Sequence, residues 1–182
     1  MDNGLIPQRY AKALYKYALE KGVTEKLYDV MKTVVSSFEK NSDLQKVLSN
    51  PFVSDEDKEK LLLAAAGKDA GDAYGRFVKL ILEHSRADYS YLMMLAYRDL
   101  YRKENNISQV HITTAANLSA GMMEKLRNLV SLSFKDSVLE FSESVDASLI
   151  GGFVIDVDSV RMDASLSNEL EQIRQTLLRS NN

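Results

Sequence analysis

Residues 150–165 read IGGFVIDVDSVRMDAS, and they predict a β-hairpin in the last third of the chain. Apolar and β-branched residues dominate Gly152–Val157 and Val160–Met162, as is typical of strands, and Asp158-Ser159 supplies turn residues between them. The pair Gly151-Gly152 stands before the first strand, where glycine permits a tight turn or a bulge. The stretch therefore predicts two antiparallel strands that are entered through a glycine turn.

The segments on either side of this hairpin complete a small α+β unit. The hydrophobic period changes at Asn105-Asn106, after which Val110, Ile112 and Thr114 alternate with other residues, as in a half-buried strand. A helix is expected from Ser119 and a second strand around residues 139–145. A closing helix carries apolar residues in register at Leu166, Leu170, Ile173 and Leu177. Residues 106–182 are thus predicted to form a β-α-β-β-β-α domain.

Residues 1–105 show helical periodicity throughout. Short connections separate six predicted helices, which is the pattern of a helical bundle. Thr24, Ser42 and Ser54 are the expected N-cap residues of the second, third and fourth helices. The fold class predicted for the whole chain is α with a smaller α+β part: an N-terminal six-helix bundle over 1–105, followed by the β-α-β-β-β-α domain.

The first helix has apolar residues on two sides. One stripe follows helical spacing and predicts a face that packs on the bundle; it comprises Ala11, Leu14, Tyr15 and Ala18. The other comprises Tyr10, Ala13 and Tyr17. A second stripe is unusual for a surface helix, and it fits either additional bundle core or the wall of a groove that receives another amphipathic helix. The pattern alone favours core.

The composition excludes several classes of function. The 182 residues include no cysteine, so a disulfide scaffold, a zinc finger and a thiolate nucleophile are excluded. The two histidines, His84 and His111, are far apart, and the net charge of −3 argues against a general nucleic-acid binder. Neither a signal peptide nor an apolar run long enough to cross a bilayer is present, which predicts a soluble intracellular protein.

No motif for catalysis or cofactor binding stands out. The chain has neither GxGxxG nor GxxxxGK[ST], and Asp156, Asp158 and Asp163 do not match a calcium-binding loop. The basic and aromatic run at residues 97–103 places Tyr97 and Tyr101 on one apolar helix face, so we interpret it as core with a solvated opposite face. A small-molecule enzyme and a nucleic-acid module remain the alternatives, and neither has a supporting motif.

Three segments, taken in order, resemble the delta subunit of F-type ATP synthases, the family of the mitochondrial oligomycin-sensitivity-conferring protein. They are RYAKALY at 9–15, LSNPFV at 48–53 and VDASLIGGFVI at 145–155, the last followed by Asp163-Ala164-Ser165. The resemblance spans nearly the whole chain. The chain departs from the family's usual pattern at Ala147, where proline is common, and at Asp156 and Asp158, where basic residues are common.

The resemblance implies a connector with no chemistry of its own. Family members cap the catalytic alpha/beta hexamer and join it to the peripheral stalk, so that rotor torque drives ATP synthesis. The N-terminal bundle would receive the N-terminal helix of an alpha subunit between its first and fifth helices. The groove residues carried over are Tyr10, Ala13, Leu14, Tyr17, Val78 and Leu82.

The resemblance also implies the remaining contacts and the location. The C-terminal domain would meet the C-terminal end of subunit b, with one copy of the chain per complex. Asp146, Gly151, Gly152 and Asp163 would form a structural motif. The implied location is the cytoplasmic face of a bacterial inner membrane, with no membrane insertion, no nucleic acid and no cofactor.

Overall fold

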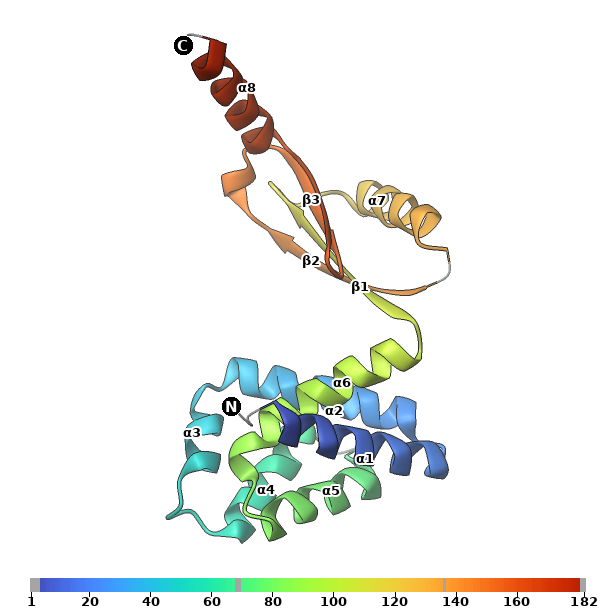
Figure 1. Ribbon diagram of the computed structural model, residues 1–182, viewed down its shortest axis with the longest axis vertical. Helices are drawn as coiled ribbons and strands as arrows, with labels where there is room; N and C mark the ends of the chain where they lie inside the picture. Colours follow the sequence, from blue (N-terminus) through green and yellow to red (C-terminus); the bar gives the residue numbers. More distant parts are fainter. Residues whose placement is uncertain (1–3, 68–69, 136, 181–182) are drawn as a thin grey trace. The chain divides into compact units, whose positions relative to one another are not determined.

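The computed structural model describes residues 4–67, 70–135 and 137–180, with side chains in the last helix described as far as Ile173. It divides into two compact units, Met1–Glu104 and Asn105–Asn182. Figure 1 shows the helices of the first unit and the sheet with its helices in the second. Each unit has its own core, and each is described by itself.

The first unit is helical, and its described residues form the six α-helices expected from the periodicity. α1 packs mainly on α6, while α2 contacts both α6 and α4, and α4 contacts α5. A 3-10 turn at Ala87–Tyr89 leads into α6. The helices are α1 Leu5–Lys21, α2 Thr24–Lys40, α3 Asp43–Ser49, α4 Asp55–Ala66, α5 Gly71–Glu83 and α6 Ser90–Glu104.

Two buried tyrosines anchor the core of this unit. The hydroxyl of Tyr74 donates to the carbonyl oxygen of Leu62 at 2.9 Å, and that of Tyr97 donates to Thr24 at 3.3 Å. Burial raises the pKa of both hydroxyls, so they remain donors at neutral pH. Tyr101 is also buried, which confirms that the aromatic residues of the 97–103 run are core.

Two of the three expected N-cap residues occupy the cap position. Ser54 caps α4, since its hydroxyl accepts from the backbone N–H of Asp57 at 3.2 Å. Ser42 is the N-cap residue of α3, but its backbone angles are helical and its side chain makes no cap hydrogen bond. The expected cap at Thr24 is wrong. Thr24 is the first residue of α2, and Val23 takes the cap position after the left-handed turn at Gly22 (φ 65°).

The second unit is a four-stranded sheet flanked by helices, as predicted. Its strand order is β2-β1-β3-β4, with β1 parallel to β2 and the other pairs antiparallel. The parallel pair requires a crossover, which α7 provides. The elements are β1 Ile107–Thr114, α7 Ala120–Ser133, β2 Val138–Val145, a 3-10 turn Ala147–Leu149, β3 Gly152–Val157, β4 Val160–Ser165 and α8 Leu166–Ser180.

The core of this unit lies between α7 and one face of the sheet (Figure 1). The buried residues come from β1, β3 and α7; they are Val110, Ile112, Ile155, Val157 and Val130. Leu139 and Phe141 of β2 pack against them. The hydrophobic alternation predicted for β1 thus faces α7, and His111 and Thr113 lie on the opposite face.

Of the four residues of the predicted structural motif, Asp146 and Gly151 lie in the turn between β2 and β3, Gly152 begins β3, and Asp163 lies on the neighbouring strand β4. Gly152 has φ +76°, and a Cβ there would overlap the backbone carbonyl of Ala164 on β4. At Gly151, an added Cβ would lie 2.6 Å from the side chain of Leu166, the first residue of α8. The two aspartates act as local caps: Asp146 accepts from the N–H of Ser148 at 2.9 Å, and Asp163 from that of Ser165 at 3.0 Å.

The capping aspartates predict a loss of stability in acid. Hydrogen bonds from the Ser165 hydroxyl and backbone N–H lower the pKa of Asp163 below its ordinary 3.8, and Ser148 does the same for Asp146. A lowered folded-state pKa stabilises the fold above the unfolded-state pKa, and this contribution is lost as pH falls through the folded-state value. We expect the contribution of these two aspartates to the stability of the second unit to be constant above about pH 5 and to decrease below about pH 4.

Asp163→Asn tests this prediction, with amide hydrogen exchange in β3 and β4 as the measurement. The variant should be less stable than the unmodified chain at neutral pH. It should also lose less stability on acidification, because asparagine has no carboxylate to bind a proton. Asp57→Asn, in the helical unit, is the matched control and should leave the acid response of the sheet unchanged. An identical acid response in Asp163→Asn and the unmodified chain would contradict the role of Asp163.

Candidate partner-binding surface of the helical unit

α1 presents two different sides, and the structure separates them. Ala11, Leu14 and Ala18 are buried. Ala13 is exposed, and Tyr10 and Tyr17 are half-buried. Of the residues implied for the groove, these last three are therefore within reach of a partner, whereas Leu14 lies beneath them in the core.

On α5, the residues named for the groove lie inside the unit. Val78 and Leu82 are both buried, as are Tyr74, Phe77 and Ile81, whereas Leu80 is exposed. Tyr10 bridges α1 to α5: its ring meets the edge of Phe77 at a centroid distance of 6.5 Å and His84 at 6.2 Å. Val78 and Leu82 can support a surface there but do not form its exposed part.

A cavity of about 390 Å³ opens where the C-terminal end of α1 meets α2 and the N-terminal end of α5. Tyr17, from the second stripe of α1, lines it. The residues that sequence reasoning missed come from α2 and α5, where one buried face was expected on each helix. The lining includes Tyr17, Lys21, Leu27, Val30, Ala73 and Arg76.

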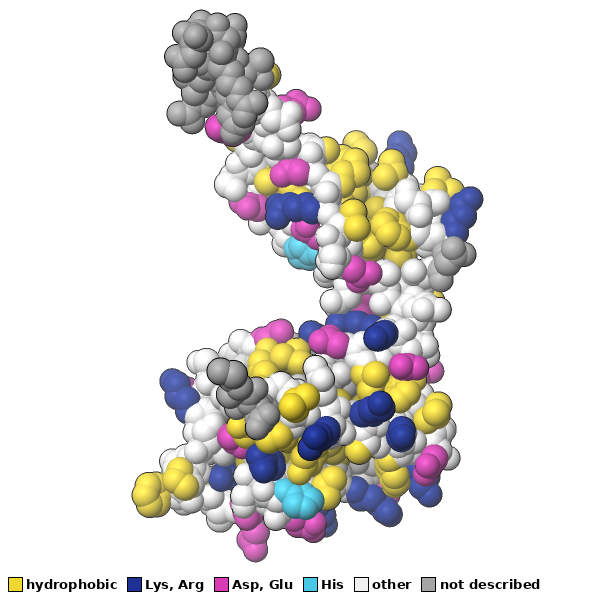
Figure 2. All heavy atoms as spheres, in the orientation of Figure 1, with side chains coloured by type: hydrophobic (Ala, Val, Ile, Leu, Met, Phe, Trp, Pro, Cys, Tyr) yellow, Lys and Arg dark blue, Asp and Glu magenta, His cyan; other side chains and the backbone are white. Residues whose placement is uncertain are grey.

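Basic side chains surround this apolar surface. Figure 2 shows hydrophobic side chains interspersed with lysine and arginine on the face of the helical unit that carries α1 and α5. Three exposed basic residues, Lys21, Lys26 and Arg76, line the cavity. Arg76 is paired with Asp72 at 2.8 Å within α5. A partner that combines an apolar face with carboxylates would complement this surface.

A second concave surface lies on the other side of α1, against α6. It encloses about 540 Å³ and is lined in part by Pro7, Ala11, Leu92, Ala96 and Leu100. The helical unit therefore offers two grooves that share α1, and only the α5 side contains Tyr17. A binding experiment must distinguish the two.

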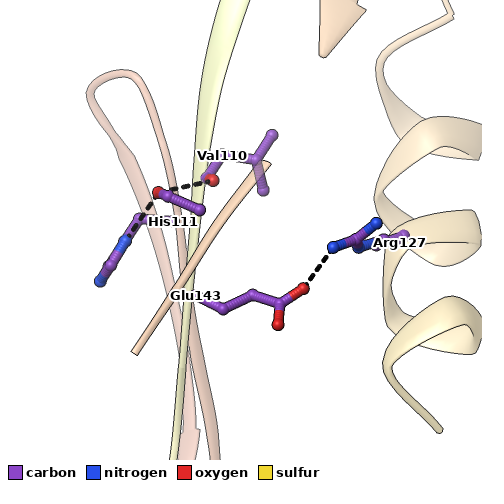
Figure 3. Close-up of polar contacts among 5 residues, drawn as sticks. Val110, His111, Arg127 and Glu143 are labelled. Carbon is purple, nitrogen blue, oxygen red and sulfur yellow. Dashed lines mark hydrogen bonds and ion pairs between the residues drawn. The ribbon is translucent and has the colours of Figure 1, made fainter. Parts of the chain in front are cut away.

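The polar contacts of the sheet unit are structural. The hydroxyl of Ser142 donates to the carbonyl oxygen of Val110 at 3.3 Å. Figure 3 shows Val110 and the neighbouring His111. Nδ1 of His111 lies 2.8 Å from the same hydroxyl oxygen, and Nε2 lies 2.8 Å from that of Ser144. His111 thus contacts two hydroxyls of the neighbouring strand β2 through its two ring nitrogens. It ties β1 to β2.

An ion pair fastens α7 to the sheet. Arg127 of α7 reaches Glu143 of β2 (Figure 3). The Arg127 guanidinium also lies over the ring of Phe141, 5.4 Å from its centroid. Within the part of the chain that the structure describes, no group of three or more His, Cys, Asp or Glu is placed to hold a metal ion. None of the described helices is both long and apolar enough to cross a membrane.

Known proteins resemble this chain over almost its full length. The family model described as ATP synthase delta (OSCP) subunit matches residues 6–177. The ATP synthase subunit delta of Parabacteroides distasonis is 38% identical, covering 98% of each chain. That of Phocaeicola vulgatus is 36% identical, covering 98% of this chain and 96% of the relative. A chain in the Toxoplasma gondii mitochondrial ATP synthase hexamer shares the fold, with a TM-score of 0.72, 20% identity and coverage of 94% and 97%.

Proposed function

Since the chain belongs to the ATP synthase delta (OSCP) subunit family, it is a non-catalytic stator connector of the F-type ATP synthase, and we propose that its helical unit receives the N-terminal helix of an alpha subunit. The connector transmits no chemical group. Its task is mechanical: it holds the catalytic head to the stator against the torque of the rotor.

The observation that carries the proposed alpha contact is the second side of α1. Tyr10, Ala13 and Tyr17 are accessible on a helix whose other side is already buried, and the cavity against α2 and α5 continues from Tyr17. Ala13 permits a partner backbone to approach closely, while two tyrosines provide large amphipathic contacts. The basic rim favours an alpha segment that carries carboxylates beside its apolar face.

We further propose that the sheet unit binds the C-terminal end of subunit b. The supporting feature is α8, on which Leu166, Leu170 and Ile173 are exposed at steps of four and three residues. Such spacing gives one apolar stripe along a helix, suited to packing on another helix. Leu177 continues the spacing, but its side chain lies outside the described residues.

The proposed location follows from the proposed partners. A connector between the head and the stalk of a bacterial synthase lies at the cytoplasmic face of the inner membrane, as a peripheral subunit. One copy per complex suffices to join one head to one stalk. The bacterial relatives support this assignment.

Calorimetric titration of the full chain with a peptide of the first 20 or so residues of its own organism's alpha subunit tests the alpha contact. We expect one-to-one binding. A stator contact must dissociate slowly, and a nanomolar Kd corresponds to about −12 kcal/mol. Absence of binding to the folded chain would contradict a site formed by the helical unit alone; reconstitution with delta-depleted catalytic head would then show whether the head is required.

A further inference from the structure

A separate cavity of the helical unit lies between the start of α4 and the connection from α5 to α6. It encloses about 550 Å³, within the range of roughly 300–1,000 Å³ that small-molecule sites occupy. Gln45 of α3 holds one wall in place, since its side-chain amide donates to the carbonyl oxygen of Asp88 at 2.8 Å. The lining includes Val53, Ser54, Asp55, Lys58, Leu82 and Asp88.

Lys58 of α4 is a buried cation in the wall of this cavity, and it is only 8% exposed. Arg102, the other cation found buried among the described residues, has partners: its Nε donates to the hydroxyl of Tyr28 at 2.8 Å, and Asp99 lies 3.8 Å away. The ammonium group of Lys58 has neither a hydrogen bond nor an ion pair with any described residue. Because an unpaired buried charge is costly, an anionic group in the cavity would stabilise this lysine.

The side chain of Lys58 is available to the cavity because it does not pair along its own helix. An aspartate, Asp55, stands three residues before it, at a spacing that favours ion pairs on a helix. Three aspartate–lysine pairs of this spacing do form in the helical unit, at 2.8 to 3.6 Å: Asp29–Lys32, Asp43–Lys46 and Asp57–Lys60. Asp55 and Lys58 form none, although both line the cavity. Helical side chains lean toward the N-terminal end of their helix, where the α4 dipole also favours a negative group.

The carboxylates that line the cavity lie nearer to solvent than the lysine does. Asp55 and Asp88 are exposed, whereas Lys58 is buried. This order of charges complements a ligand with its negative group innermost and a positive group at the mouth. Two carboxylates would repel a purely anionic ligand such as phosphate. Val53 and Leu82 provide apolar wall between the charged groups, suited to a short hydrocarbon chain.

We propose that this cavity binds a small zwitterion, such as a free amino acid, with its carboxylate on Lys58 and its ammonium group beside Asp55 and Asp88. A bound zwitterion would link the start of α4 to the connection between α5 and α6 and would stabilise the helical unit. The site is distinct from the α1 surface proposed for the alpha subunit, because the two cavities share no lining residue. The connector thus has a small-molecule site in addition to its protein contacts.

Nuclear magnetic resonance titration of the nitrogen-15-labelled full chain tests the proposal. The ligands are glycine, β-alanine and γ-aminobutyrate, which differ in the distance between their two charged groups. Acetate and methylammonium each supply one of the charges alone. We expect at least one of the three amino acids to shift the amide resonances of Ser54, Lys58 and Asp88. Its Kd should be at least tenfold lower than that of acetate or methylammonium.

Lys58→Met keeps an apolar stem of similar length and removes the charge, so it should raise the Kd for the amino acid at least tenfold. Lys60→Met changes an exposed lysine of the same helix and is the matched control, which should bind as the unmodified chain does. Asp88→Asn, at an exposed position, should weaken binding of the amino acid but not of acetate. Near-ultraviolet circular dichroism of the tyrosines checks that each variant is folded.

Four results would overturn the proposal. Absence of shifts with all three amino acids would show that the cavity binds no small zwitterion. Equal affinity for acetate would show that it selects only a negative group. Unchanged binding in folded Lys58→Met would exclude the lysine as the carboxylate partner, and unchanged binding in Asp88→Asn would contradict the position of the ligand's ammonium group. Titration with the alpha peptide reports separately on the α1 surface, so the two proposals fail independently.

Discussion

Replacing Gly152 by valine should unfold the sheet unit or shift its strand register while leaving the helical unit intact. Gly152 has φ +76°, a conformation that a β-branched residue adopts only at a cost of about 1–3 kcal/mol. The added Cβ would also overlap the carbonyl of Ala164, which is backbone and cannot rotate away. Gly152 pairs with Ser165 at the end of the β3–β4 ladder, so the clash falls where the hairpin register begins. We expect a loss of roughly 4 kcal/mol or more, most of the stability of a small domain.

The chain offers separate signals for its two units. All nine tyrosines lie between residues 10 and 101, so near-ultraviolet circular dichroism of tyrosine reports on the helical unit. Amide hydrogen exchange in β1 to β4 reports on the sheet. In Gly152→Val the tyrosine signal and its melting should stay as in the unmodified chain, and protection in the strands should be lost.

Gly151→Val is the matched control for this experiment. Its Cβ would meet the side chain of Leu166, a partly exposed leucine that can change rotamer. We expect a loss of about 1–2 kcal/mol, in the usual range of overpacking, with the sheet still formed. Equal damage from both substitutions would show that the positive φ of Gly152 is not the cause. Loss of alpha-peptide binding in Gly152→Val would contradict the independence of the two units.

Most elements of the fold were predictable from their hydrophobic period, and α4 from its N-cap Ser54 and acidic first turn. The change of period at Asn105-Asn106 predicted where helices give way to strands, and Gly151-Gly152 marked the turn into the hairpin. Cap positions were less predictable. The left-handed turn at Gly22 ends α1, and α2 begins only two residues later. Val23, rather than Thr24, therefore takes the cap position of α2.

The candidate surface was predictable on α1 but not on α5. Tyr10, Ala13 and Tyr17 form a second stripe that a helical projection shows directly. On α5 every large apolar residue of the expected face is needed by the core, including Val78 and Leu82. The accessible side includes small and charged residues such as Ala73 and Arg76, which no hydrophobic pattern identifies, together with the exposed Leu80. The shape of a groove depends on how several helices pack together, whereas hydrophobic periodicity in the sequence describes one helix at a time.

Ala13→Asp should weaken binding of the alpha N-terminal peptide about a hundredfold without unfolding the helical unit. Ala13 is exposed in the middle of α1, so the lower helix propensity of aspartate costs only about 0.7 kcal/mol or less. In the complex the carboxylate would be buried against the apolar side of the partner helix, and the partner's own carboxylates would repel it. A penalty of roughly 3 kcal/mol is expected, which is about a hundredfold weaker binding by calorimetry.

Two alanine-to-aspartate controls make this result specific to one groove. Ala64→Asp changes an exposed alanine of α4, away from both grooves, and should bind the peptide normally. Ala96→Asp changes the groove between α1 and α6 and should also bind normally if the site lies on the α5 side. Loss of binding in Ala96→Asp together with normal binding in Ala13→Asp would move the alpha contact to the α6 side of α1. Both grooves share α1. The comparison of Ala13→Asp with Ala96→Asp therefore distinguishes a partner that lies over Tyr17 from one that lies over Leu92.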